Sequence, residues 1–379
     1  MEPATSYAST LVTQEMDGNG LSPVGRHLSQ WRIRRGLAVA SLATRSGLPE
    51  KLIEDLEAGR DWADRRHVLS ALAAGLRLDP VELTGQPYVP YGKEHSAVHS
   101  LGWHARRYLA RVLVAGSAAG EADQGQLGAL VAELRAADDE GDLTSAALKV
   151  PGVLELIGPP PAGTGRGTAV LRTAAHVSVS RFLRMLGYRD LAWGVLSQAR
   201  PAADDVSAVL GEEVRLLLDM GQAELAVARA ARAEVDSPAE VVLPLALARA
   251  ALGDEVESER LLAIAQRTAA TSQQRSQVAS AGAFAAAERG AHDRVLDRAA
   301  GATCLSAGDR SALLVLTASA HARLGRYAAA TEDLLAAESA ASMHARLDPL
   351  ARELVHVLRS RPQEHSEALG SLAGRFGMK

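Results

Sequence analysis

The chain has 379 residues, of which 47% are hydrophobic and 3% aromatic, and its net charge is −4. The length suits two or three domains, and the mildly acidic balance excludes a protein that coats nucleic acid over its whole surface, so any DNA contact has to be local. The single cysteine, Cys304, excludes a disulfide framework or a cysteine-based zinc site within one chain.

Residue usage narrows the class further. Alanine and leucine dominate and β-branched residues other than valine are few, which favours an all-α fold. Of the 41 basic residues 37 are arginine, a hint of a GC-rich genome such as that of an actinobacterium. No apolar run reaches the length of a membrane helix and no basic start precedes an apolar core, so we expect no membrane segment, no signal peptide and a cytoplasmic location.

The chain opens with a polar segment followed by a helix. Residues 1–22 are rich in Ser, Thr, Gly and Asn and predict a disordered arm. A helix is expected to begin at Pro23 and to run to Arg35, where Gly36 stops it. Its four arginines are expected outside the apolar stripe: Arg26, Arg32, Arg34 and Arg35.

Residues 36–59 have the spacing of two short helices that meet at Gly47. A glycine there suits a tight turn that needs positive φ. Pro49 suits the first position of the second helix, which would run to about Ala58 and end at Gly59. One apolar surface would join the two helices: Leu37, Leu42, Ala43, Leu48, Ile53 and Leu56.

Two more helices complete this segment. Apolar residues recur at helical spacing over residues 68–76, and Asp79 and Pro80 have the residue types of an N-cap and a first helical position. Five helices within residues 23–86 predict one small domain.

The framework of residues 24–85 resembles the lambda-repressor/Cro-like (Xre-type) helix-turn-helix domain, and the tail Leu83 to Tyr88 resembles that of actinobacterial regulators of this type. The residues that carry the resemblance are Trp31 to Arg35, Gly36, Leu37, Leu42, Ala43, Gly47, Leu48, Ile53, Leu56, Glu57, Gly59, Leu69, Leu72, Ala73, Leu76 and Leu78. The resemblance implies a homodimer that binds double-stranded operator DNA, with one recognition helix in each half-site.

The positions expected to face DNA depart from the family pattern. Ala38 and Val39 stand where the family usually has Ser or Thr followed by Gln, and Val39 cannot hydrogen-bond to a phosphate or base. The recognition helix presents mostly carboxylates, which DNA repels unless they accept from a cytosine amino group. The DNA-binding residues that the resemblance implies are Arg34, Arg35, Arg45, Glu50, Lys51, Glu54, Asp55 and Arg60.

Charge leaves two interpretations of the arginines open. Residues 23–85 contain ten cationic and eight anionic side chains, and this net +2 only weakly favours DNA. The arginines would hold flanking phosphates, with Lys51 as the cationic base reader; alternatively they are ordinary solvated side chains or intrahelical ion pairs. Glu57 matches a structural glutamate of the family, which more often pairs with an arginine than with DNA.

Beyond this domain the sequence predicts a hinge and connector helix over residues 87–120 and a repeat array over residues 121–379. Glycines recur at intervals of 32 to 37 residues, each after a helical stretch and before an alanine-rich one: Gly187, Gly221, Gly253, Gly290 and Gly325. The pattern resembles tetratricopeptide repeats, whose period is about 34 residues. We therefore expect a tetratricopeptide-like (TPR-like) α-solenoid, or a generic helical array of nearly the same physical kind.

Counting back from the turn glycines places three arginines on the inner surface of this array: Arg181, Arg184 and Arg215. They predict a groove for an anionic small molecule or a peptide carboxylate, because arginine binds carboxylates bidentately. The alternative is that they pair with neighbours such as Asp190, Glu212 or Glu213.

We expect no enzyme, cofactor or metal site. Residues 158–168 superficially resemble a phosphate-binding loop, but they lack the essential lysine and the Ser or Thr that would hold magnesium. His95, His99 and His104 lack supporting carboxylates or cysteines, so a metal site is not expected. No nucleophile elbow with triad partners occurs.

Two hypotheses remain. In the first, the chain is a one-component transcriptional regulator whose array dimerises and senses a ligand or peptide. In the second, the helix-turn-helix no longer binds DNA, and its acidic third helix docks on a partner protein as an adaptor or anti-regulator scaffold. Residues 101–113 and 348–376 are the candidate dimer surfaces, and Leu350, Leu354, Val357 and Leu358 of the second could equally belong to a capping repeat of the array.

Overall fold

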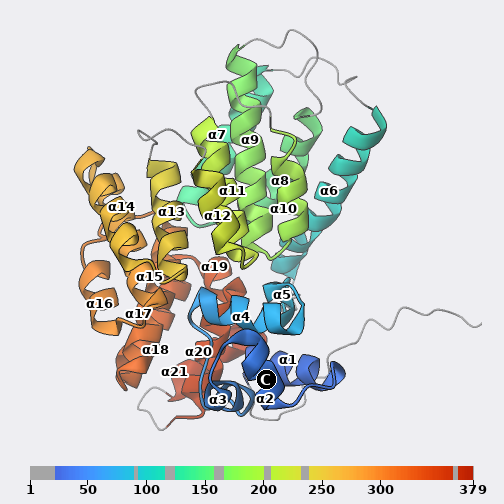
Figure 1. The fold of residues 1–379 in the computed structure, drawn as a ribbon. Helices are drawn as coiled ribbons and strands as arrows, with labels where there is room; N and C mark the ends of the chain where they lie inside the picture. The colour runs from blue at the N-terminus through green and yellow to red at the C-terminus, as the bar shows by residue number, and fades with distance from the viewer. Residues whose placement is uncertain are drawn as a thin grey trace, which may run out of the picture.

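A computed structural model describes residues 22–88, 93–115, 124–157, 166–199, 206–231, 239–361 and 366–378. Within these ranges every regular element is a helix, and they are numbered α1 to α21 (Figure 1). The predicted all-α fold is therefore confirmed. The predicted disordered arm lies outside the described residues except for Ser22, as do parts of the predicted hinge, of the loop at 116–125 and of the break at 158–168.

The N-terminal part forms a five-helix domain, referred to below as the HTH domain: α1 (Pro23–Arg34), α2 (Val39–Ser46), α3 (Glu50–Glu57), α4 (Arg66–Leu76) and α5 (Pro80–Thr84). Leu28, Leu42, Ile53 and Leu56 lie in its single apolar core and are fully buried. Gly47 ends α2 with a φ of +69°, a conformation that favours glycine. The helix-turn-helix predicted over residues 36–59 is thus present.

Two details of this domain differ from the expectation. Pro49 is the N-cap of α3 rather than its first helical residue, because its ψ of 137° is extended. Arg32 is not outside: its side chain is 15% exposed and forms an ion pair with Glu57 of α3. The spacing of apolar residues in the sequence does not reveal this ion pair. Glu57 supplies a partner for the charge of Arg32 between two packed helices.

The connector α6 (Lys93–Ala115) leads into six helix pairs, α7 to α18, called the array together with the three helices that follow. The pairs are α7 (Gln124–Asp139) and α8 (Leu143–Leu156), α9 (Arg166–Met185) and α10 (Arg189–Leu196), α11 (Val206–Asp219) and α12 (Ala223–Ala230), α13 (Ala239–Ala251) and α14 (Glu255–Thr268), α15 (Ser272–Glu288) and α16 (His292–Ala299), α17 (Ala307–Arg323) and α18 (Tyr327–Ala340). The chain continues with α19 (Ser342–Leu347), α20 (Pro349–Arg359) and α21 (Ser366–Arg375).

The glycines predicted at the repeat turns all adopt the left-handed conformation, with φ between +69° and +91°. Each lies between the two helices of a pair, so the TPR-like organisation is confirmed in the array. A further turn glycine, Gly141, joins α7 to α8 with a φ of +69°. The repeat pattern missed it because α9 is 20 residues long, which places Gly141 out of step with the glycines that follow.

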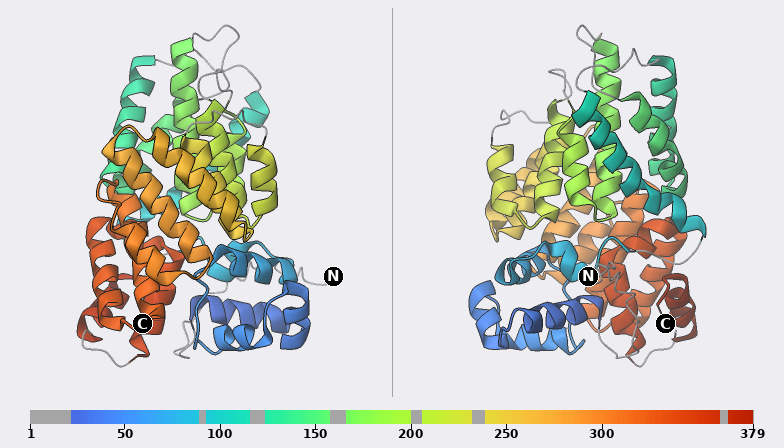
Figure 2. Two further views of the ribbon diagram at one scale, coloured as in Figure 1. Left: turned by 60° about the vertical axis from the view of Figure 1, so that its left-hand side comes forward. Right: turned by 90° about the vertical axis from the view of Figure 1, so that its right-hand side faces the viewer.

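The array curves until its last helices meet its first. A Cβ atom on Gly141 would lie 2.7 Å from the Cβ of Ala341 and 3.0 Å from that of Ala307. Met343 and Leu347 of α19 belong to the same apolar core as residues of α8 and α9. Figure 2 shows the C-terminal helices beside the HTH domain, with both of them below the earlier helix pairs. The inner surface is therefore partly closed.

The HTH domain packs on the array, with α1 against α20 and with α4 and α5 below the helix pairs (Figure 1). Residues of α20 expected at a candidate dimer surface, including Leu354 and Leu358, are buried in a core shared with Trp62 of the HTH domain. That side of α20 is therefore occupied within the chain itself.

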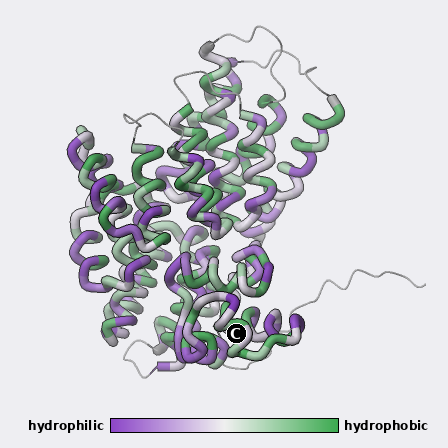
Figure 3. The backbone as a smooth tube through the Cα atoms, viewed as in Figure 1, coloured by the Kyte–Doolittle hydropathy of each residue, from purple (hydrophilic) through white to green (hydrophobic). Residues whose placement is uncertain are grey.

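Hydrophobic and hydrophilic residues alternate along the helices, as expected for amphipathic elements that pack on one face (Figure 3). In the part of the chain that the structure describes, no helix combines the length and apolarity required to cross a membrane.

Candidate nucleic-acid interface and arginine cluster

The second helix of the helix-turn-helix, α3, turns two of its carboxylates, Glu50 and Glu54, to solvent. Ile53 and Leu56 are fully buried and hold α3 on α1 and α2. Glu50, Lys51 and Glu54 are exposed, because they lie on the opposite side of the helix from these two anchors. The side chains predicted to face DNA on α3 therefore do lie on an accessible surface, which we call the outer face together with Arg34, Arg35, Arg45 and Arg60.

Asp55 holds two of the cations predicted to contact DNA. Lys51 Nζ lies 2.7 Å from Asp55 Oδ2, and Arg60 Nη2 lies 2.7 Å from Asp55 Oδ1. Hydrogen bonds from Lys51 and Arg60 hold the pKa of Asp55 below its usual value. Both cations are thus partly neutralised in the absence of DNA.

Arg34, Arg35 and Arg45 are exposed beside the helix-turn-helix. The guanidinium of Arg34 lies 5.2 Å from the centre of the Trp31 ring, and that of Arg35 lies 6.0 Å from it. Arg35 also donates to the carbonyl of Arg77 at 3.5 Å. These contacts are weak at an exposed site and leave the guanidinium groups accessible to phosphates.

Glu57 is held inside the domain. Its two carboxylate oxygens accept from Arg32 Nε at 2.6 Å and from Nη2 at 2.7 Å, and Arg32 Nη1 donates to the carbonyl of Leu37 at 2.8 Å. The expected pairing of Glu57 with an arginine is confirmed. The bidentate pair joins α1, α3 and the turn before α2, so it fixes the recognition helix on its support.

The opposite side of the HTH domain, its inner face, presents helix N-termini to the array. Glu353 of α20 is 1% exposed and accepts from the backbone N–H of Val24 in the first turn of α1 at 2.6 Å. Glu288 of α15 is 5% exposed and accepts from the backbone N–H of Arg66, the first residue of α4, at 3.2 Å. The positive ends of two helices therefore meet buried carboxyl groups of the array.

A second group of contacts on the inner face surrounds Arg323 of α17. Its guanidinium pairs with Asp61 and with Asp64, at 2.8 Å to Asp64 Oδ2, and lies 3.8 Å from the centre of the Trp62 ring. Trp62 Nε1 donates to the hydroxyl of Ser319 at 3.0 Å. The segment between α3 and α4 is thereby fixed to the array by charge and packing together.

The three arginines predicted for the ligand groove lie close together. Arg184 Nε is 2.7 Å from Glu212 Oε1, and its Nη1 is 2.8 Å from Asp219 Oδ2. Arg181 Nη1 is 3.1 Å from Asp138 Oδ2, and its Nη2 is 3.3 Å from Asp309 Oδ1. We call Arg181, Arg184 and Arg215 the arginine cluster.

Electrostatics couple the members of the cluster. Burial lowers the pKa of Arg215, Glu212 raises it, and the charges of Arg184 and Arg181 lower it again. Burial also works against the charge on Arg184, but Glu212 and Asp219 outweigh it and raise its pKa. Three guanidinium groups thus share one region with acidic neighbours, one of which, Glu212, was named beforehand as an alternative partner.

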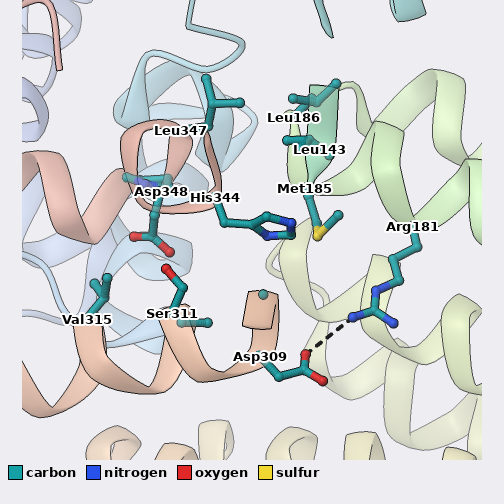
Figure 4. A pocket seen from close by; sticks show the side chains of 13 residues that line it. Leu143, Arg181, Met185, Leu186, Asp309, Ser311, Val315, His344, Leu347 and Asp348 are labelled. Atoms are coloured by element: carbon teal, nitrogen blue, oxygen red, sulfur yellow. Dashed lines mark hydrogen bonds and ion pairs between the residues drawn. The ribbon is translucent and has the colours of Figure 1, made fainter. Parts of the chain in front are cut away.

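A cavity of about 170 Å³ lies at the edge of the cluster (Figure 4). Arg181 and Met185 of α9 line one side, Asp309 lies beside Arg181, and His344 and Leu347 line the side that faces α9. Burial lowers the pKa of His344 to about 4, so this imidazole is neutral at pH 7. The cavity combines the cation Arg181 with the carboxylates Asp309 and Asp348 and with apolar side chains, and Arg184 and Arg215 are outside its lining.

Two further expectations concern the partner of Glu213 and a metal site. Glu213, another alternative partner, pairs instead with Arg229 at 2.7 Å. Among the described residues no group of three or more His, Cys, Asp and Glu side chains is arranged to hold a metal ion.

Sequence reasoning missed the docking residues of the array, chiefly Glu288, Arg323, Glu353 and the shared Asp219. Arg323 and Asp64 are 259 positions apart, and neither stands in a recognisable motif. One signal was available: Arg323 and Glu288 each directly precede a repeat turn, at the end of the first helix of a pair.

Neither a protein-family model nor a curated protein sequence matches the chain. Among solved structures, the chain is similar to the crystal structure of Bacillus thuringiensis PlcR in complex with the peptide PapR7 and DNA. The two are 10% identical over 85% of this chain and 95% of that one, with a TM-score of 0.28. At that score the likeness carries no argument, so the function of this chain has to be argued from its own residues.

Proposed function

We propose that the chain is a one-component transcriptional regulator of the lambda-repressor/Cro-like (Xre) type. Its HTH domain binds double-stranded operator DNA through α2 and α3, as a homodimer with one recognition helix in each half-site. The array dimerises and senses an anionic effector, a small molecule or a peptide carboxylate, at the arginine cluster. The chain has no enzymatic activity in this proposal.

One observation carries the proposal: docking occupies the inner face and leaves the outer face accessible. It also pairs charged residues of the HTH domain with charged residues of the array. Arg323 and Arg189 of the array pair with Asp61, Asp64 and Asp79, whereas Glu288 takes up the charge of Arg66. Docking therefore places Asp61, Asp64 and Asp79 against arginines of the array on the inner face, away from the exposed arginines of the outer face.

The acidic α3 then defines the mode of binding. Arg34, Arg35 and Arg45 would hold phosphates, and Lys51 and Arg60 would join them by exchanging Asp55 for the DNA backbone. Glu50 and Glu54 would contribute specificity, because a carboxylate in the major groove is tolerated where it accepts from a cytosine amino group.

The test is binding of the full chain to fluorescent DNA from its own upstream region at about 50 and about 200 mM salt. Replacing Arg34, Arg35 and Arg45 together by alanine should weaken binding about 100-fold and flatten the salt dependence, because phosphate contacts release counterions. The matched control removes three exposed arginines of the array: Arg260, Arg275 and Arg294. Equal weakening in both triple variants, or no DNA recovered from a genomic pull-down, would sink the proposal.

The second candidate is an adaptor whose α3 docks on a partner protein. It is favoured by the Asp55 pairs, which leave α3 with the exposed carboxylates Glu50 and Glu54 and no unpaired cation among its own residues. Recovery of a protein but no DNA by the wild-type chain, lost in Glu50→Lys/Glu54→Lys, would support it.

A further inference from the structure

Asp219, the last residue of α11, lies between the arginine cluster and the HTH domain. On one side its carboxylate is 2.8 Å from Arg184 Nη1. On the other side it is 3.9 Å from Nε of Arg66, the first residue of α4. Arg66 is also held by Glu288 at 3.2 Å, and its guanidinium lies 5.7 Å from the centre of the Phe284 ring.

The charge of Asp219 is shared. Burial would raise its pKa, but Arg184, Arg189 and Arg66 together hold it below the usual value. Two of these guanidinium groups also act elsewhere: Arg184 belongs to the cluster, and Arg189 holds Asp79, the N-cap of α5, at 2.9 Å. A change at Arg184 therefore alters the attraction between Asp219 and Arg66 of the HTH domain, whose side chains are partly buried.

The two contacts of Asp219 differ in length, and this difference predicts the direction in which its carboxylate would move. Its pair with Arg184 is close, whereas the pair with Arg66 is at the edge of ion-pair distance. An anion at Arg184 would satisfy that guanidinium and repel Asp219. The carboxylate would then be attracted more strongly to Arg66.

We propose that Asp219 is a positioning residue that couples the arginine cluster to the docked HTH domain. An anion that displaces Asp219 from Arg184 shifts Asp219 toward Arg66 and tightens α4 on the array. This inference rests on the proposed function for the effector. By linkage, a change that loosens α4 lowers the affinity for the anion by the same factor by which the anion tightens α4. Arg181 is not on this route, because its partners are Asp138 and Asp309.

The coupling can be measured in the full chain without DNA or effector. The double variant Arg184→Gln/Glu212→Gln frees Asp219 from Arg184 and removes both charges of the Arg184–Glu212 pair together. Amide hydrogen exchange over residues 66–70 reports how firmly α4 is held. We expect this variant to slow exchange there roughly fivefold in the wild-type background, and by less than about twofold when Asp219→Asn is also present.

A matched control is Arg181→Gln, which removes a cation of the same cluster and should leave exchange over residues 66–70 unchanged. If the double variant changes exchange equally with and without Asp219→Asn, or changes it in neither background, the inference is overturned. Should a variant unfold, Arg66→Lys keeps the charge and should preserve the coupling, whereas Arg66→Gln should abolish it. The readout does not involve DNA, so a chain that binds no operator still tests the coupling.

Discussion

The inner and outer faces of the HTH domain use similar charges in different surroundings. On the inner face Asp64 and Glu288 have side chains that are 8% and 3% exposed, and arginines reach both. On the outer face Lys51 is 74% exposed although it pairs with Asp55 as closely. Buried pairs fix geometry because separating them leaves an unpaired charge, whereas exposed pairs exchange partners at little cost. We infer that the inner face positions the domain on the array, and in the proposed function the outer face binds DNA.

The largest expected effect comes from Arg323, which holds two carboxylates and the Trp62 ring. Arg323→Ala should lower the free energy of unfolding by about 3 kcal/mol, because it leaves Asp64 buried without its partner. Arg326→Ala is the control, since Arg326 is 53% exposed and 3.8 Å from Asp293. Urea unfolding measures the loss of unfolding free energy in both variants. Similar losses would contradict the claim that buried ion pairs stabilise the chain more than exposed ones.

The second test uses pH. Burial raises the pKa of Glu353 to about 7, so the folded state keeps a proton that the unfolded state releases near pH 4.5. The stability contributed by this carboxyl is thus complete below about pH 4.5 and is lost as pH rises to 7. Glu353→Gln still accepts from Val24, and should raise the unfolding free energy at about pH 8 by about 2 kcal/mol with little change at pH 4.5. Glu50→Gln on the outer face serves as the control; identical pH profiles for the two variants would contradict the prediction.

The third test compares two repeat glycines with similar φ, +74° at Gly221 and +77° at Gly253. A Cβ on Gly221 would lie 2.8 Å from Ser70 Oγ and 3.3 Å from Pro80 Cγ of the HTH domain, whereas a Cβ on Gly253 would meet nothing within 4 Å. Both alanine variants carry the backbone cost of about 1 kcal/mol. Gly221→Ala should cost about 1 kcal/mol more, measured as the difference in urea unfolding. Equal losses of unfolding free energy in the two variants would contradict this prediction, because they would mean that the inner face accommodates an added methyl group without cost.

The smallest effect on stability is expected at Asp55. Asp55→Asn should leave the unfolding free energy nearly unchanged, since its partners are exposed. It should, however, strengthen DNA binding roughly threefold at low salt by releasing Lys51 and Arg60. Asp293→Asn on α16 removes an exposed charge from the array and should leave DNA affinity unchanged in the same anisotropy titration.

Local patterns predicted the fold well and the docking not at all. Gly47 and the repeat glycines mark turns that only their own neighbours determine, so a single sequence reveals them. The site was predicted in part: counting back from turn glycines placed Arg181 and Arg184 in one region. Pairs such as Glu353 with Val24 join segments 329 residues apart, and no periodicity encodes a partner at that distance.

The capping of α1 by Glu353 also has a consequence for biosynthesis. At about 5–20 residues per second a ribosome adds the 329 residues between Val24 and Glu353 in roughly 20 to 60 seconds. Throughout that interval the nascent domain carries α1 without its acceptor, and for much of it α4 also lacks Glu288. The HTH domain is therefore synthesised first but gains its last contacts with the array only near the end of translation. A truncated transcript that lacks α15 and α20 would yield an HTH domain without the contacts that fix its orientation.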